Sequence, residues 1–136
     1  MRRTEFLPIL PTLALLVTAC AADNALTSGS TACQPGSALV LLGDATLDRR
    51  CGCAEAAFRF SMPTTGFSCT VARGTTVFFT LDSAVQSHQL VPTSGSQFPA
   101  GPLNAPTHAV TFSTAGTYGF QDAFNTLLTG QIIVTP

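Results

Sequence analysis

Charge is scarce in this chain, and lysine is absent altogether. Charged residues occupy 10% of the 136 positions, and six arginines stand against seven aspartates and glutamates, which gives a formal net charge of −1 at pH 7. A nucleic-acid-binding surface requires clustered basic residues, because contacts to phosphates dominate its affinity. The sequence contains no such cluster, so we expect no nucleic acid among the partners of this protein.

The motifs of common enzyme classes are also missing. The sequence has no glycine-rich phosphate loop and no pair of carboxylates flanked by the signals of an apolar pocket. Ser87 and His88 are adjacent, but neighbours on an extended strand point to opposite faces, so they do not form a nucleophile and its base. We therefore expect no enzymatic activity.

No apolar run is long enough to cross a bilayer, which requires about 20 apolar residues. The longest run, residues 6–19, is interrupted by two prolines. Arg2 and Arg3 precede it, and it ends in the small residues Val17-Thr18-Ala19. This order of a basic, an apolar and a small-residue segment is typical of a secretory signal that is removed from the mature protein.

The cysteine that follows this segment, Cys20, makes it similar to a bacterial lipoprotein signal. The resemblance implies cleavage after residue 19, acylation of Cys20 and anchoring of the chain in a membrane by lipid. Ala21 in place of an aspartate favours the outer membrane in a bacterium with two membranes. The alternative is an ordinary secretory signal followed by a structural Cys20.

Behind the signal, the sequence predicts a tether and one domain. Residues 21–32 are rich in small and polar side chains, which is typical of a flexible linker. We therefore expect a signal peptide in residues 1–19, the lipidated cysteine and its tether in residues 20–32, and a single domain in residues 33–136.

Turn-forming residues interrupt the domain roughly every 8–12 positions, a spacing typical of all-β sandwiches and barrels. Residues 44–57 contain a possible short helical turn, and the segment 92–106, rich in proline, glycine and serine, is expected to separate strands. The expected strands are residues 38–42, 57–60, 68–72, 75–81, 88–91, 109–112, 117–120 and 130–134.

The alternation of side chains along two of these strands predicts which residues face the core. Val77 and Phe79 share a face, and Phe120 shares one with Asp122 if its strand continues that far. The Asp122 carboxylate would then point inward, which is costly unless it is paired or hydrogen-bonded.

Four cysteines lie beyond the signal and Cys20: Cys33, Cys51, Cys53 and Cys69. An even number in an exported chain predicts two disulfides. A Cys51–Cys53 bond is the least favourable, because its small ring is strained. We expect Cys51 and Cys53 to bond separately to Cys33 and Cys69, in an order the sequence does not determine. The alternative is a Cys51/Cys53 thiolate pair that binds Cu(I) or exchanges disulfides.

Two segments carry a resemblance to a known family. The first is Gly74-Thr75-Thr76-Val77-Phe78-Phe79-Thr80-Leu81-Asp82, followed by His88, and the second is residues 112–134, with Gly116-Thr117-Tyr118-Gly119-Phe120 and Gly130-Gln131-Ile132-Ile133-Val134. Together they resemble the cupredoxins of the plastocyanin and amicyanin type. The resemblance implies a Greek-key β-sandwich for the domain.

The same resemblance implies a degenerate copper site. His88 falls on the first histidine ligand of the family, whereas Asp122 stands at the cysteine, Asn125 at the second histidine and Leu128 at the methionine. A blue-copper site requires a thiolate and two imidazoles, with a weak axial thioether. We therefore expect no copper cofactor of that type.

These residues suggest two hypotheses. In the first, His88 and Asp122 form a hydrogen-bonded or ionic pair that replaces the metal; the alternative is that His88 is an ordinary polar residue at a loop edge. In the second, His88, His108, Asp122 and Asn125 supply nitrogen and oxygen ligands for Cu(II) or Zn(II).

Two classes of function follow. The first is a lipid-anchored, cupredoxin-like module of the cell envelope that holds no metal, contacts the membrane through its lipid and acts as a binding or structural domain toward an envelope protein. The second is a copper-binding or electron-transfer protein with a non-standard ligand set.

Overall fold

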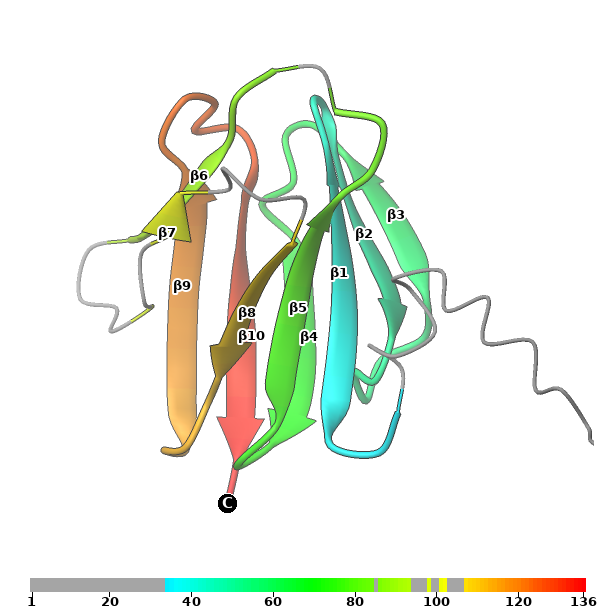
Figure 1. Cartoon of the computed structure of the whole chain (residues 1–136), viewed down its shortest axis with the longest axis vertical. Coiled ribbons are helices and arrows are strands. Elements are labelled where there is room, and N and C mark those ends of the chain that lie inside the picture. Colours follow the sequence, from blue (N-terminus) through cyan, green and yellow to red (C-terminus); the bar gives the residue numbers. More distant parts are fainter. Residues whose placement is uncertain (1–33, 85, 94–97, 99–100, 103–106) are drawn as a thin grey trace, which may run out of the picture.

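The computed structural model describes residues 34–84, 86–93, 98, 101–102 and 107–136. These residues form ten β-strands and no helix, arranged as two packed sheets (Figure 1). One sheet has the strand order β3 (Phe58–Ser61), β2 (Thr46–Cys51), β1 (Ser37–Gly43), β5 (Thr76–Leu81) and β8 (Thr107–Thr111). The other has the order β4 (Phe67–Ala72), β10 (Thr129–Thr135), β9 (Gly116–Asp122), β6 (Gln89–Pro92) and β7 (Gly101–Pro102). The expected all-β sandwich is confirmed.

The expected signal, Cys20 with its tether, and Cys33 lie outside the described residues. Within the described part, no helix has the length and apolar character needed to cross a membrane.

The strand directions gather four connections at one end of the sandwich. β1 runs parallel to β5, and β4 runs parallel to β10, while the other pairs are antiparallel. As a result, the β1–β2, β3–β4, β5–β6 and β9–β10 connections lie together at the top of Figure 1, and we call this the loop end. The start of β1 and the C-terminus lie at the opposite end.

The core between the sheets is built around phenylalanine rings. Phe79 and Phe120, one from each sheet, are completely buried, and their ring centroids lie 5.4 Å apart. Phe98 contacts both rings, at 5.6 and 5.1 Å. Burial of each such ring contributes about 1.5–3 kcal/mol to folding. The inward position predicted for Val77 and Phe79 from strand alternation is confirmed.

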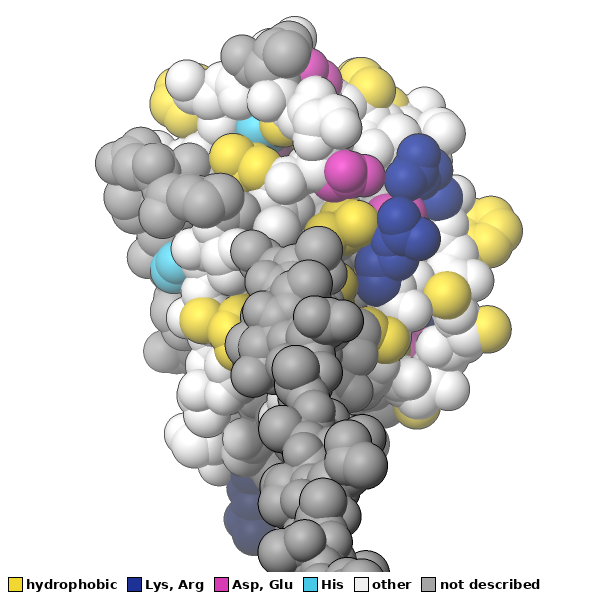
Figure 2. All heavy atoms as spheres, turned by 45° about the vertical axis from the view of Figure 1, so that its right-hand side comes forward, with side chains coloured by type: hydrophobic (Ala, Val, Ile, Leu, Met, Phe, Trp, Pro, Cys, Tyr) yellow, Lys and Arg dark blue, Asp and Glu magenta, His cyan; other side chains and the backbone are white. Residues whose placement is uncertain are grey.

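The helical turn suggested within residues 44–57 is wrong, because this segment contains strand β2. β2 is unusually polar: Asp48 and Arg49 are both buried. Asp48 forms ion pairs with Arg50 and Arg59, at 3.4 and 3.0 Å. Figure 2 shows arginine and carboxylate side chains next to one another on one part of the surface. The sequence of β2 does not alternate between apolar and polar residues. The segment forms a strand nevertheless, because it pairs with β1 on one side and β3 on the other.

A second strand, β7, was not expected, because it lies inside the segment 92–106 that was predicted to separate strands. It pairs with β6 at the edge of its sheet, where a proline can be accommodated since one of its sides needs no ladder hydrogen bond.

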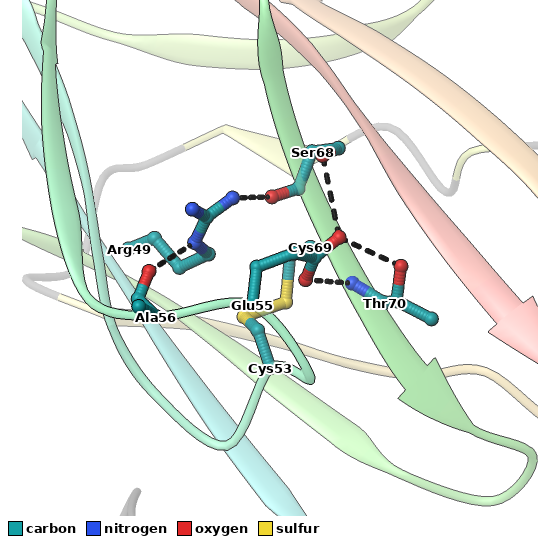
Figure 3. Close-up of a disulfide and its surroundings, with 7 residues drawn as sticks. All are labelled: Arg49, Cys53, Glu55, Ala56, Ser68, Cys69 and Thr70. Atoms are coloured by element: carbon teal, nitrogen blue, oxygen red, sulfur yellow. Dashed lines mark hydrogen bonds between the residues drawn. A yellow bond between two sulfur atoms is a disulfide. The ribbon is translucent and has the colours of Figure 1, made fainter.

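A disulfide links Cys53 to Cys69 and fastens the β2–β3 connection to β4 (Figure 3). Cys51 is also disulfide-bonded. The separate bonding of Cys51 and Cys53 is therefore confirmed, and in this structure the two cysteines are oxidised and do not form a pair of thiolates.

Next to this disulfide, the Glu55 carboxylate accepts hydrogen bonds from the backbone N–H and the hydroxyl of Thr70, both at 2.8 Å. Burial by itself would raise the pKa of Glu55, but these hydrogen bonds, a backbone one within Glu55 and the charge of Arg49 outweigh it. The pKa of Glu55 is therefore held below its ordinary value of 4.5.

Candidate functional site

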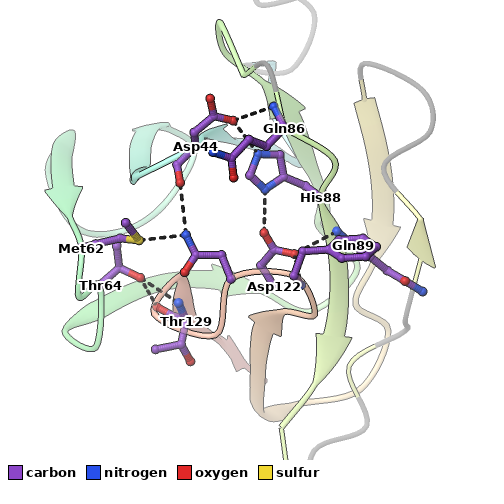
Figure 4. Close-up of polar contacts among 10 residues, drawn as sticks. Asp44, Met62, Thr64, Gln86, His88, Gln89, Asp122 and Thr129 are labelled. Atoms are coloured by element: carbon purple, nitrogen blue, oxygen red, sulfur yellow. Dashed lines mark hydrogen bonds and ion pairs between the residues drawn. The ribbon is translucent and has the colours of Figure 1, made fainter.

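A buried histidine occupies the centre of the loop end. The His88 side chain is 1% exposed, and it lies directly before β6. Its Nδ1 lies 2.6 Å from Oδ2 of Asp122, and its Nε2 lies 3.2 Å from Oδ1 of Asp44 (Figure 4). The predicted His88–Asp122 pair is confirmed, and the alternative of an ordinary polar residue at a loop edge is wrong. Asp44 is a third member that the sequence analysis did not identify.

Asp122 is the last residue of β9 and is fully buried, on the same inward face as Phe120. Besides its contact with His88, its carboxylate accepts hydrogen bonds from the backbone N–H groups of Gln89 and Phe124, both at 3.0 Å. Three hydrogen bonds compensate for the loss of water around the charge. They also join the start of β6 to the loop that follows β9.

Asp44 lies in the tight connection between β1 and β2, and its side chain is 25% exposed. Its Oδ1 also accepts a hydrogen bond from the backbone N–H of Gln86 at 3.0 Å. Its backbone carbonyl accepts one from the side-chain amide of Asn125 at 3.2 Å. The network around His88 therefore connects the β1–β2, β5–β6 and β9–β10 segments.

Both nitrogens of the imidazole ring have a carboxylate partner. Ionised carboxylates can only accept hydrogen bonds, and both ring nitrogens of His88 face carboxylate oxygens. Neither ring nitrogen is therefore left without a hydrogen-bond partner, and the ring joins Asp44 to Asp122.

The loop after β9, residues 123–128, has a fixed backbone. The N–H of Asp122 donates to the carbonyl of Leu128 at 2.9 Å, which closes the loop at its base. The N–H of Thr64, from the β3–β4 connection, donates to the carbonyl of Leu127 at 3.0 Å. From this backbone, Phe124 and Leu127 project outward and are 67% and 54% exposed.

Asn125 and Leu128 have structural contacts in this loop. The Asn125 amide donates to the carbonyl of Asp44 and to the Met62 sulfur, 3.0 Å away. Leu128 is 1% exposed and belongs to the hydrophobic core.

His108 does not join this network. It lies on β8, opposite Phe79, in the sheet that does not contain β6 and β9. Its Nε2 is buried without a hydrogen-bond partner within the described part of the chain. No three or more His, Cys, Asp or Glu side chains of the described residues are grouped so as to hold a metal ion.

Comparison with known proteins gives a likeness of structure but none of sequence. No protein-family model and no curated protein matches this sequence. A mutant of amicyanin in its Cu(I) form is 17% identical, aligns over 75% of this chain and 85% of its own, and gives a TM-score of 0.52. The purple cupredoxin of Nitrosopumilus maritimus is 19% identical, aligns over 73% of this chain and all of its own, and gives a TM-score of 0.51. The fold is cupredoxin-like.

This cupredoxin-like sandwich brings together three of the side chains that the sequence analysis proposed, His88, Asp122 and Asn125, and adds Asp44. Within the described residues, the network contains one imidazole, two carboxylates and one amide. Asp44 was missed because it lies in the tight turn between β1 and β2. An aspartate in a turn carries no sequence signal for a partner 44 residues away.

Proposed function

We propose that this protein is a lipid-anchored, cupredoxin-like module of the cell envelope that binds a partner protein with its loop end and does not transfer electrons through type 1 copper. The observation that carries the proposal is the engagement of both ring nitrogens of His88 by carboxylates. A metal needs a free lone pair on one of these nitrogens, and each nitrogen already lies within hydrogen-bond distance of a carboxylate oxygen.

The residues at the other ligand-like positions support the same conclusion. The positions that resemble the copper ligands hold a carboxylate at Asp122, an amide at Asn125 and an aliphatic side chain at Leu128. None of them is the thiolate, second imidazole or thioether that a blue-copper centre uses. We propose that the network of Asp44, His88 and Asp122 performs the structural task of a metal by joining three loops.

The anchor is proposed from the sequence. Acylation of Cys20, with Ala21 after it, would attach the chain to the outer membrane. The described chain begins beside β1, at the end of the sandwich opposite to the loop end (Figure 1). A tether that enters there would direct the loop end away from the membrane, toward other proteins of the envelope.

The proposed contact surface is formed by Phe124 and Leu127. Aromatic and aliphatic side chains dominate the energetics of protein interfaces when a partner buries them. Their loop is already held by backbone hydrogen bonds, so binding would require little further ordering. This rigid, uncharged tip fits an apolar pocket in a partner protein.

Metal binding is the first test. The purified protein is incubated separately with Cu(I), Cu(II) and Zn(II), and bound metal and visible absorption are measured for the wild type and for His88→Ala. The proposal expects no stoichiometric metal in either protein. Stoichiometric metal that is lost in His88→Ala would contradict it and would favour the second function, a copper-binding or electron-transfer protein with a non-standard ligand set. That alternative is favoured by one observation, the Cu(I) bound by the amicyanin to which the fold is similar.

The contact surface has its own test, with a matched control on the same molecule. A photo-crosslinking amino acid is placed at position 124 or at position 58 in cells, since Phe58 is 58% exposed on β3 and lies outside the loop end. We expect a defined protein adduct from position 124 that disappears in Leu127→Ala and does not form from position 58. Equal adducts from both positions would contradict a specific loop-end surface.

A further inference from the structure

The free edge of β4 is covered in an unusual way. β4 is the outermost strand of its sheet, so one row of its backbone N–H and C=O groups has no neighbouring strand. Residues 53–56, which we call the strap, lie against this edge (Figure 3). Such edges are prone to pair with another chain, and proteins cover or charge them for that reason.

Side chains make most of the hydrogen bonds between the strap and the edge. The Thr70 carbonyl accepts the N–H of Ala54 at 2.8 Å, which is a backbone bond. The Thr70 N–H donates instead to the Glu55 carboxylate. The Arg49 guanidinium donates one hydrogen bond to the Ser68 carbonyl and another to the carbonyl of Ala56 in the strap. Of these hydrogen bonds, only the one from Ala54 to Thr70 joins two backbones, so the strap does not pair with β4 as a strand would.

One covalent bond holds the strap in place. The Cys53–Cys69 disulfide connects the strap to β4 itself, at the residue before Thr70. Cys69 is fully buried, whereas Cys53 is partly exposed, so an attacking thiolate reaches the Cys53 sulfur first. The disulfide is therefore the removable part of the cover.

We propose that reduction of Cys53–Cys69 by a dithiol releases the strap, and that the uncovered β4 edge then pairs with the same edge of a second copy of this chain. One thiolate of the dithiol attacks the Cys53 sulfur and forms a mixed disulfide, and Cys69 leaves as a thiolate that takes up a proton. The second thiol of the dithiol then attacks the mixed disulfide and releases Cys53. The dithiol ends as a disulfide, and its two electrons and two protons end on Cys53 and Cys69.

The sequence of β4 makes a second copy the fitting partner. The strand is Phe67-Ser68-Cys69-Thr70-Val71-Ala72, six residues without charge and without proline. Two identical edges can pair antiparallel around a two-fold axis, which closes the assembly as a dimer. Like charges directly opposite each other would oppose this pairing, and β4 has none.

Hydrogen exchange at the Thr70 amide reports on release of the strap, and the Thr70→Pro substitution is the control for dimerisation. In the double variant Cys53→Ala/Cys69→Ala, we expect the amide of Thr70 to exchange its hydrogen faster by about tenfold or more, while amides of the core strand β5 keep their protection. Light scattering is then expected to show a dimer. The wild type is expected to give the same two results in dithiothreitol, which also reduces the disulfide of Cys51, so the double variant is the selective test. Thr70→Pro in the double variant removes the outward N–H and is expected to restore the monomer, because an edge strand tolerates proline there.

Two results would overturn the proposal. If the double variant remains monomeric while Thr70 exchanges fast, the uncovered edge does not recruit a second copy. If the amides of β5 lose protection together with Thr70, the strap does not open separately from the fold. A dimer that persists with Thr70→Pro would also overturn it, because that dimer would use another surface.

Discussion

Replacing Asp122 by alanine should be among the most damaging single changes outside the hydrophobic core. The side chain is fully buried and accepts hydrogen bonds from His88 and from the N–H groups of Gln89 and Phe124. Alanine removes all three acceptor contacts at once. It leaves the imidazole with Asp44 as its remaining carboxylate partner.

The magnitude follows from these contacts. A buried donor without an acceptor costs about 1–3 kcal/mol, so three of them sum to roughly 3–9 kcal/mol before any relaxation. Water that enters the vacated space, and relief from burying a charge, offset part of this cost. Breaking a buried ion pair by removing one partner typically costs about 3–5 kcal/mol, and we expect Asp122→Ala to lose that much free energy of unfolding.

Urea unfolding followed by circular dichroism measures this loss. Domains of this size are stable by about 5–15 kcal/mol, so the variant should remain folded without denaturant. Asp122→Asn is the milder control, because its amide oxygen can still accept the backbone N–H of Gln89 and of Phe124, and it should lose about 1–3 kcal/mol. A loss below about 1 kcal/mol for Asp122→Ala would refute the reasoning, as would additive losses in a double-mutant cycle with His88→Ala.

Three further predictions concern other parts of the fold. Because the folded-state pKa of Glu55 lies below 4.5, its carboxylate stabilises the fold at pH values above 4.5, and this contribution is lost as the pH falls through the lower folded-state pKa. The difference in unfolding free energy between the wild type and Glu55→Gln should therefore shrink in acid, and a difference that grows there would contradict the assignment. Gly130→Ala should cost about 1–3 kcal/mol, because the new Cβ would lie 2.6 Å from a ring carbon of the β4 phenylalanine, whereas Gly66→Ala, with its nearest atom at 4.0 Å, should be nearly neutral in the same urea assay. Leu128→Ala should lower the free energy of unfolding by about 2–5 kcal/mol and Leu127→Ala by less than about 0.5 kcal/mol, so equal losses would show that the loop is not held as described.

Alternation and turn spacing were sufficient to predict most of the strands and the inward position of Asp122. The period of two along β9 places Asp122 on the face of Phe120, and an inward carboxylate demands a partner. Only the resemblance to cupredoxins suggested His88 as that partner. Periodicity within one strand carries no information about which loop lies opposite.

The features that the sequence analysis missed depend on contacts between distant segments. β2 carries Asp48 and Arg49 where a buried strand usually has apolar residues, and these charges are tolerated only because of partners on β3 and β4. Asp44 enters the network because the parallel pairing of β1 with β5 brings the turn after β1 beside the segment after β5. The order of the disulfides depended on the same packing, since Cys53 reaches Cys69 across the two sheets.

On the proposed function, the network and a copper site are alternatives that single substitutions cannot interconvert. A cysteine at position 122 alone would remove the carboxylate that holds the His88 ring and the two backbone N–H groups, while positions 125 and 128 would still offer an amide and an aliphatic chain. Such a protein would have lost the buried ion pair without gaining the metal-binding free energy that contributes to folding in a metal site. The members of each arrangement stabilise one another, so a sequence between the two is less stable than either. The network does not require a bound metal. It therefore keeps the loop end, with Phe124 and Leu127 on its surface, in one conformation whichever metals are present in the compartment.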